Sequence, residues 1–336
     1  MGRVVLVTGV SHDFGSRFAR LLSEVPGIDR VIGVDVVPPR GDLGTVSFTR
    51  ADIRNPVIAK VIAGQDVDTV VHMSVRSSTG AGRSSAKEHN VIGTMQLLAA
   101  CQKAPGLERL VVKSSTAVYG SSSRDPAMFT EDMSAKRIPR SGYARDVLEV
   151  EGYVRGFARR RPDVAVTMLR AANLVGPTVD SPLTQYFRLP VIPTPLGFDA
   201  RLQLLHETDL LAALRHATLD GVHGSFNLAG PGVLMLSQAV RRLGRPTVSV
   251  PGFALNSLGG VLKQAGYRAL TPDLNAFLTF GRGVDTSRTS SVLGFTPDYT
   301  TEAAFADLAR SITPGLLPSP QQAAVALAGE LGGERA

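Results

Sequence analysis

The chain has 336 residues, of which a single one, Cys101, is a cysteine, and it has no uninterrupted apolar stretch of about 18 residues. One cysteine excludes an intramolecular disulfide and any metal site built from thiolates alone. Cys101 lies in an apolar helical pattern, which predicts a buried side chain. Only four apolar residues follow Met-Gly-Arg, so we expect no signal peptide. These absences favour a cytoplasmic protein that does not span a membrane.

The sequence also lacks internal repeats, low-complexity tracts and the mixture of basic and aromatic residues that is typical of nucleic-acid binding. Its formal net charge of +7 is compatible with an anionic ligand such as a nucleotide. The densest basic cluster, Arg155 with Arg159–Arg161, closes a helical pattern, where cations are favoured. We therefore predict a small-molecule partner and no nucleic acid.

Short apolar segments alternate with helical patterns through most of the chain. After a first strand and helix, strands are predicted at 30–36, 46–49, 67–72, 107–112, 164–169 and 225–228, and helices at 56–63, 87–103, 142–160 and 206–218. Continuous apolar strands alternating with helices are typical of a parallel sheet covered on both faces, with right-handed crossovers. The sequence predicts an α/β fold with a Rossmann-like, doubly wound parallel sheet.

The composition changes after Gly176-Pro177, where proline-rich and irregular segments begin. We predict a Rossmann-like domain over 1–176, to which 201–228 return, and a smaller C-terminal substrate domain built from 177–200 and 229–316. Residues 317–336 are predicted to form a loose tail.

The stretch 3–15 carries the strongest local pattern. Val4–Val7 predicts a buried strand, Thr8-Gly9 interrupts it, and Phe18 and Leu22 follow at helical spacing. Strand, glycine turn and helix are typical of a dinucleotide-binding βαβ unit, whose helix N-terminus faces a pyrophosphate. We expect the loop residues to contact the cofactor: Gly9, His12, Asp13, Phe14 and Gly15. His12 stands where the middle glycine is usual, so its side chain either obstructs the phosphates or the loop rearranges around it.

Asp35 ends the second predicted strand, about 20 residues after the glycine loop. A carboxylate there accepts hydrogen bonds from both hydroxyls of the adenosine ribose and repels a 2′-phosphate, which favours NAD over NADP. The alternative is an ordinary aspartate at the end of a strand.

Further landmarks occur in a characteristic order: Asp52-Ile53, 70–74, Asn90 with Gly93-Thr94, 114–120, Tyr143, 169–173, Gly176-Pro177, His206 with Asp209, and 293–297. With the glycine loop and Asp35, they resemble the extended short-chain dehydrogenase/reductase family, in its NAD-dependent epimerase/dehydratase branch. The sequence is most similar to proteins described as UDP-glucose 4-epimerase-like. The resemblance implies NAD as cofactor, with contacts from Asp52, Ile53, Ser74, Asn90 and Tyr143, and substrate contacts from Ser115 and Asn173.

The resemblance also implies hydride transfer to and from the nicotinamide, with Tyr143 as acid/base and Ser115 holding the substrate oxygen. In that family a lysine four residues after the tyrosine grips the nicotinamide ribose and lowers the tyrosine pKa; here the position is Val147. Arg145 lies two residues from Tyr143 and points to another side of the helix. Lys113 adjoins the serine segment, but the sequence alone does not place its amine.

Two more positions depart from the family pattern. The Asp-Glu pair of its dehydratases is replaced by Thr116 and Ala117, which argues against 4,6-dehydration. The arginine that usually grips the diphosphate of a sugar nucleotide is replaced by Leu202, and Arg201 would face the other way in a strand.

Several polar residues have structural alternatives. His72 ends a buried strand and is either a satisfied core histidine or a cofactor contact. His206 and His216 are ten residues apart without carboxylate or cysteine company, so no metal site is predicted. Glu149 and Glu151 point to different helix faces, and we expect both to be solvated.

Two functions remain open from the sequence. The first is an NAD-dependent epimerase or oxidoreductase acting on a sugar nucleotide or another secondary alcohol. The second is a catalytically silent, NAD-responsive or scaffold protein that keeps the fold for binding, as His12, Val147 and Leu202 together suggest. The resemblance also implies a homodimer through the helices at 87–103 and 142–160, since members of that family often dimerise in this way.

Overall fold

The computed structural model describes residues 2–75, 86–139, 142–252, 254–255, 257, 259 and 270–313. Its centre is a seven-stranded sheet in the order β11-β6-β5-β4-β1-β2-β3, and every neighbouring pair is parallel. The strands are β1 (Arg3–Thr8), β2 (Ile28–Asp35), β3 (Ser47–Arg50), β4 (Thr69–His72), β5 (Arg109–Ser115), β6 (Ala165–Ala171) and β11 (Gly224–Leu228). The predicted α/β fold with a Rossmann-like, doubly wound parallel sheet is confirmed.

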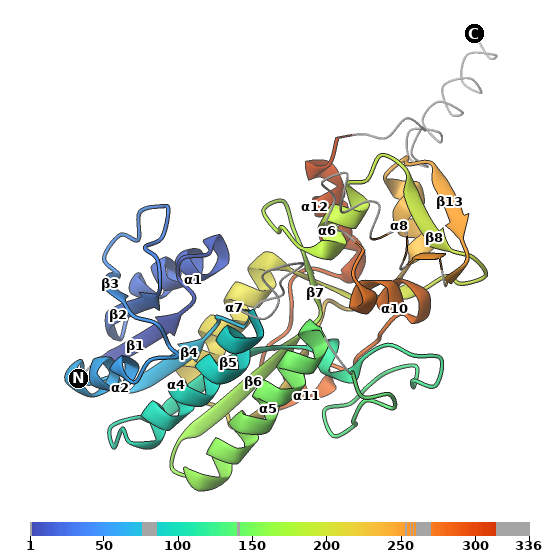
Figure 1. Cartoon of the computed structure of the whole chain (residues 1–336). Helices are drawn as coiled ribbons and strands as arrows, with labels where there is room; N and C mark the ends of the chain where they lie inside the picture. The colour runs from blue at the N-terminus through green and yellow to red at the C-terminus, as the bar shows by residue number, and fades with distance from the viewer. Residues whose placement is uncertain are drawn as a thin grey trace, which may run out of the picture.

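Helices cover both faces of this sheet. They are α1 (Asp13–Ser23), α2 (Val57–Gly64), α4 (Gly93–Gln102), α5 (Tyr143–Arg160) and α7 (Glu207–Asp220), and a π-helical turn, Glu88–Ile92, precedes α4. Figure 1 shows α4 and α5 side by side on one face, with α1 and α7 on the other. The strand order reverses between β1 and β4: β2 and β3 are added on one side of β1, and β4 and the later strands are added on the other. Open α/β sheets bind ligands outside the carboxyl ends of the strands at such a point.

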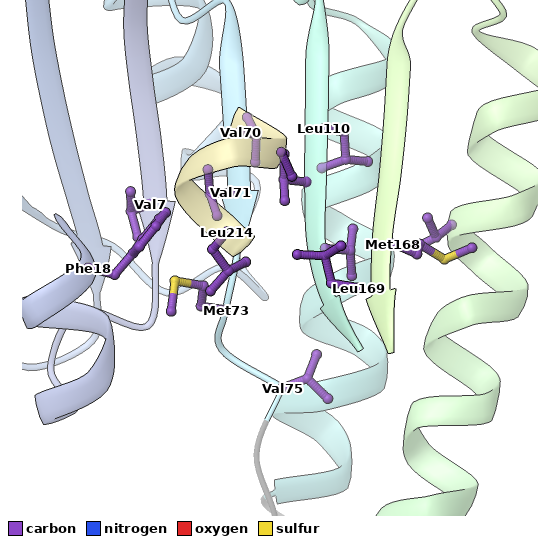
Figure 2. Packing of buried hydrophobic residues seen from close by; sticks show 14 of the residues in the cluster. Val7, Phe18, Val70, Val71, Met73, Val75, Leu110, Met168, Leu169 and Leu214 are labelled. Atoms are coloured by element: carbon purple, nitrogen blue, oxygen red, sulfur yellow. The ribbon is translucent and has the colours of Figure 1, made fainter. Parts of the chain in front are cut away.

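The core explains why the strands are so apolar. Val7, Val71, Leu110 and Leu169 come from four adjacent strands and are fully buried. Figure 2 shows these side chains, with Leu214 of α7 beside Val71. The strand registers place Val7, Val71 and Leu169 on one face of the sheet and Leu110 on the other. Both faces of a parallel sheet are covered, so an alternating polar face is absent from these strands. Cys101 is also fully buried, as predicted.

The β5 strand differs from its predicted bounds in a way that matters for the site. The apolar pattern predicts an end at Val112, yet the strand continues to Ser115 because its ladder with β6 persists to the pair Ser115–Ala171. Lys113, Ser114 and Ser115 therefore alternate between the two faces of the sheet. They do so at its carboxyl edge.

Most of the remaining elements surround a second buried cluster, which includes Tyr186, Phe187, Leu278 and Phe305. They are β7 (Asn173–Val175), α6 (Pro182–Phe187), β8 (Ile192–Pro195), β9 (Arg201–Leu202), β10 (Leu204–His206), β12 (Leu234–Met235), α8 (Leu236–Arg242), β13 (Thr247–Val250), α10 (Pro272–Phe280), α11 (Ser287–Ser291) and α12 (Thr301–Ser311). Small two-stranded sheets join β10 with β7, β12 with β9 and β13 with β8. The domain bounds stay a prediction, and the tail at 317–336 lies outside the described residues.

Candidate active site

A cavity of about 740 Å³ opens at the carboxyl edge of the sheet, between the glycine loop and α10. Most of the predicted site residues line it: Gly9, His12, Asp13, Phe14, Gly15, Ser74, Ser115, Tyr143 and Asn173. A second cavity of about 590 Å³ is lined by Val36, Arg50, Asp52 and Lys60, among others. Asp35 lies one residue before Val36 in the chain, at the end of β2.

The glycine loop requires both of its glycines. Gly9 has a φ of +85°, and a Cβ there would lie 3.0 Å from the Ser74 Cα. A Cβ on Gly15 would lie 2.2 Å from the Gly9 carbonyl oxygen. His12 needs no glycine, because its φ of −94° and ψ of 144° are ordinary extended backbone at the N-cap of α1. The loop therefore accommodates His12 with its side chain exposed at the cavity wall.

Asp35 is held by backbone donors. The Ser11 amide donates to its Oδ2 at 3.0 Å, and the Val36 amide donates to its Oδ1 at 2.7 Å. The carboxylate is thereby fixed beside the glycine loop, with further acceptor capacity on its two oxygens. This is the placement that the ribose prediction requires.

Besides Asp35, three predicted cofactor contacts lie outside the main cavity. Asp52 faces the second cavity, where hydrogen bonds from Arg54 at 2.7–3.0 Å lower the pKa of its carboxyl. Ile53 is buried against Gly93, and Asn90 is buried and donates to Asp146 at 3.2 Å. Ile53 and Asn90 thus fix the packing of α4 in this structure, and their cofactor role stays a prediction.

Ser115 and Tyr143 meet at the far end of the main cavity. Ser115 ends β5 and accepts a hydrogen bond from the Ala117 amide at 3.2 Å, which caps the 3₁₀ turn Thr116–Tyr119. Tyr143 begins α5 directly after Gly142, whose φ is +87°. Burial raises the pKa of Tyr143 to about 12, although a hydrogen bond with Ser115 opposes the shift. At neutral pH the Tyr143 hydroxyl therefore keeps its proton.

The position of the missing lysine lies in the core. Val147 has no exposed surface and packs in the main apolar cluster. Arg145 pairs with Glu149 at 2.7 Å, away from the cavity. Lys113, which the sequence did not place, lines the cavity together with Ser115 and Tyr143, because Lys113 and Ser115 are two residues apart on one strand. Burial lowers the pKa of its amine to about 8.

The opposite face of β5 carries a buried ion pair. Arg170 donates to both oxygens of Glu151 at 2.8 and 2.9 Å, and Ser114 donates to Glu151 at 2.5 Å. Burial opposes the charge on Arg170, but the hydrogen bonds from Arg170 to Glu151 raise its pKa. The expectation of a solvated Glu151 is therefore wrong: the sequence pattern of α5 did not reveal that Arg170, on β6, lies opposite.

Arg282 is a cavity residue that the sequence analysis missed. Its guanidinium donates to the Gly120 carbonyl at 2.6 Å and to the Ser121 hydroxyl at 3.1 Å, and burial lowers its pKa to about 10. It pairs as an isolated bridge with Leu202, whose side chain is buried, while Arg201 is exposed. Its only sequence signal is an arginine between Gly281 and Gly283, far along the chain from the other site residues.

The model of the NAD dependent epimerase/dehydratase family matches residues 5–189, more than half of the chain. The chain belongs to this family. An uncharacterized protein of Mycobacterium bovis is 48% identical over 324 residues, covering 94% of this chain and 86% of that protein. UDP-glucose 4-epimerase 2 of Oryza sativa subsp. japonica is 31% identical over 191 residues, covering 52% of this chain and 45% of the epimerase.

Among solved structures, the UDP-glucose-4-epimerase of Stenotrophomonas maltophila with bound NAD and formylated UDP-arabinopyranose superimposes with a TM-score of 0.69. The sequence identity is 21%, and the match covers 97% of this chain and 99% of the epimerase. The likeness confirms the fold. Membership in the NAD dependent epimerase/dehydratase family confirms the predicted resemblance and the predicted cofactor, NAD.

Within this family member, His72 is a structural residue. Its Nδ1 is 2.9 Å from the Thr8 hydroxyl and its Nε2 is 2.8 Å from the Thr94 hydroxyl. Burial lowers its pKa to about 3, so the ring is neutral and ties β1, β4 and α4 together. The core alternative for His72 accounts for both ring nitrogens.

The other two histidines of interest also have structural partners. His206 lies 3.1 Å from Asp307 and stacks on Tyr299, while His216 lies 2.6 Å from the Leu293 carbonyl. Among the described residues, no group of three or more His, Cys, Asp or Glu side chains is arranged to hold a metal ion. No helix in that part of the chain is long and apolar enough to cross a bilayer.

Proposed function

We propose that this chain is an NAD-dependent epimerase or oxidoreductase that interconverts a secondary alcohol and a ketone on a sugar nucleotide. The observation that carries the proposal is that Ser115 and Tyr143 line the same cavity as the glycine loop. A serine and a tyrosine hydroxyl can hold one substrate oxygen between them while hydride leaves the carbon.

The described residues fit NAD. A Cβ on Gly9 or Gly15 would meet the backbone of Ser74 or Gly9, so glycine lets the loop turn closely here, and among the described residues no side chain caps the α1 N-terminus that follows it. Asp35 offers carboxylate oxygens to the adenosine ribose beside this loop. NAD, when bound, supplies the hydride acceptor and donor; the protein positions it and excludes water.

Arg282 and the neighbours of Ser115 support the sugar-nucleotide class. Arg282 brings a positive charge into the cavity near Phe277 and Asn173, where a diphosphate could be paired. Thr116 and Ala117 follow Ser115, so the acidic pair that a 4,6-dehydratase would use there is missing. Epimerisation or simple oxidation therefore fits the site better than dehydration.

A second candidate function is NAD binding without turnover. The burial of Val147 in the core favours it, because no lysine on α5 can lower the pKa of Tyr143. The two candidates share the cofactor and differ only in chemistry.

Calorimetric titration with NAD tests the cofactor half of the proposal. We expect binding, and we expect Asp35→Asn to weaken it by about tenfold or more, since a hydrogen bond to a charged group is lost. Asp132→Asn, an exposed site on a loop, is the matched control and should leave the affinity unchanged. No binding at millimolar NAD would refute the assignment.

Interconversion of UDP-glucose and UDP-galactose, followed by chromatography, tests the chemical half. Turnover that Tyr143→Phe reduces by a hundredfold or more supports the enzyme. NAD binding with no turnover on any sugar nucleotide of a broad panel supports the second candidate.

A further inference from the structure

We propose that Lys113 of β5 is the proton-accepting group of this active site, and that Tyr143 acts as a hydrogen-bond donor to the reacting oxygen. This inference rests on the proposed hydride-transfer function. In this proposal the proton of the substrate hydroxyl goes to a residue on a strand, and not to a tyrosine on α5 that a lysine activates.

Strand geometry places Lys113 in the same cavity wall as Ser115. Lys113 and Ser115 project from the same face of β5, and Ser114 between them projects to Glu151 on the other face. The cavity wall thus carries an amine and two hydroxyls, from Lys113, Ser115 and Tyr143. A substrate oxygen bound by the two hydroxyls lies in the same cavity as the amine.

The other cations near this point are already engaged. Arg282 donates to Gly120 and Ser121, and Arg170 is closed into its pair with Glu151 on the opposite face. Lys113 differs from both: within the described part of the chain, no carboxylate forms an ion pair with it and no hydrogen bond of its amine is found. A buried amine without a counter-charge readily exists as the neutral base.

Charged and titratable groups lie on each element around Lys113. His72 of β4 is neutral, Tyr143 and Asp146 belong to α5, Glu207 of α7 is held by Arg17 at 2.6 Å, and Asp273 and Arg282 line the same cavity. None of these groups sets the protonation of Lys113, since burial alone lowers its pKa to about 8.

The two candidate bases differ in how often they are ready to accept a proton. With a pKa of about 8, roughly a tenth of Lys113 is neutral at pH 7. With a pKa of about 12, only about one Tyr143 in 100,000 is ionised at that pH. General bases work best when their pKa lies near the operating pH, which favours the amine.

The proton and electron balance of the step is simple. As the substrate C–H bond breaks, its electron pair and hydrogen go as hydride to the nicotinamide of NAD, and the C–O bond becomes a carbonyl. The O–H proton goes to the Lys113 Nζ, which becomes an ammonium group. Return of the same hydride and the same proton to the carbonyl restores an alcohol, with either configuration at the carbon.

The first test needs no substrate. Acetic anhydride acylates neutral amines only, so the pH dependence of labelling, measured by mass spectrometry of the Lys113 peptide, reports its titration. We expect a midpoint near 8 for Lys113, and the exposed Lys103 in the same sample serves as the internal reference for the reactivity of the reagent. Saturating NAD should slow the labelling of Lys113 at least tenfold and leave that of Lys103 unchanged.

The outcomes separate this inference from the proposed function. A Lys113 midpoint at about 10.4, the value of an ordinary lysine, or no protection in protein that calorimetry shows to bind NAD, overturns the role of Lys113. Failure to bind NAD at all overturns the proposed function instead, and the labelling midpoint is read independently of it.

Variants decide between a base and a mere cation. Lys113→Met and Lys113→Arg should each lower kcat/KM by a hundredfold or more, and abolish its rise with a midpoint near pH 8. A guanidinium keeps the charge but cannot accept a proton, so activity retained in Lys113→Arg contradicts the proposal. Lys103→Met controls for loss of a lysine, and circular dichroism verifies that each variant is folded.

Discussion

The basic side chains on the two faces of β5 differ in whether a carboxylate pairs with them. On one face, Arg170 of the neighbouring strand is closed between Glu151, Tyr119 and the Glu131 carbonyl. On the other face, Lys113 lines a cavity, and the described residues provide it with no carboxylate partner. The ion pair of Arg170 holds α5 against the sheet. Lys113, in contrast, presents an amine that can exchange a proton with a ligand in the cavity.

This contrast separates structural charge from functional charge. Glu151 is completely buried, and its oxygens are satisfied by Arg170, Ser114 and Arg155. A fully paired buried network is costly to break and has no titration near neutral pH to offer. An unpaired amine is costly to keep, and a protein retains such a group most readily where chemistry needs it.

The largest effect is expected from the paired face. Glu151→Gln leaves Arg170 buried without a counter-charge, so we expect the free energy of unfolding to fall by about 3–5 kcal/mol. Urea unfolding followed by circular dichroism measures it. The double variant Glu151→Gln/Arg170→Met should lose less than the sum of the two single variants, and a loss below about 1 kcal/mol for Glu151→Gln would break the comparison.

The substitution Val147→Lys tests whether a lysine on α5 can take the role that we assign to Lys113 on β5. Val147→Lys places a charge among apolar side chains at a position with no exposed surface, so we expect a loss of about 2–4 kcal/mol. Val147→Met, which keeps the site apolar, should cost less than about 1.5 kcal/mol. If Val147→Lys unfolds like the wild type and raises turnover, the α5 lysine is the group this site lacks, and Lys113 does not replace it.

Lys113→Met should raise the free energy of unfolding, whereas the two preceding substitutions lower it. The pKa of Lys113 is about 8 in the folded state and near 10.4 when unfolded, so the unfolded chain binds more protons between these values. The wild type therefore bears the full cost below pH 8 and gains stability as the pH rises from about 8 to 10.4. We expect Lys113→Met to be more stable by roughly 1–3 kcal/mol at pH 7, reduced by partial solvent screening.

That advantage should vanish above about pH 11, because the amine at position 113 is then neutral in both the folded and the unfolded state. Thermal melts over this pH range, with Lys103→Met as the reference for the loss of an exposed lysine, give the measurement. A Lys113→Met variant that is destabilised at pH 7 would show that the amine has a stabilising partner.

Much of the fold follows from the sequence, since each strand of the parallel sheet is an apolar run that must be buried on both faces. The glycine loop, Ser115 and Tyr143 are likewise predictable, because local backbone geometry dictates Gly9 and Gly15 and a family pattern marks the hydroxyls. All of these signals are short-range. They can be recognised in a single sequence without knowing which residues pack against them.

The roles of Lys113, Glu151 and Arg282 depend on long-range neighbours. Lys113 reaches the cavity because β5 extends three residues beyond its apolar run, which pairing with β6 decides. Glu151 is buried because Arg170 lies opposite, 19 residues along the chain. Arg282 enters the cavity through a single bridge to Leu202, and no periodicity in the sequence indicates that contact.

The smallest effect is expected from the exposed ion pair on α5, which differs from the Glu151 pair mainly in its burial. Glu149 lies two residues before Glu151 on α5 and also pairs with an arginine, Arg145, at 2.7 Å, but that pair is 25–40% exposed. We expect Glu149→Gln to change the free energy of unfolding by only about 0.3–0.5 kcal/mol, and high salt to reduce that further. Urea titrations of Glu149→Gln and Glu151→Gln side by side provide the measurement. If the two losses are equal, burial does not distinguish the two pairs; a ratio near ten shows that desolvation, not the presence of an ion pair, makes the Glu151 face structural.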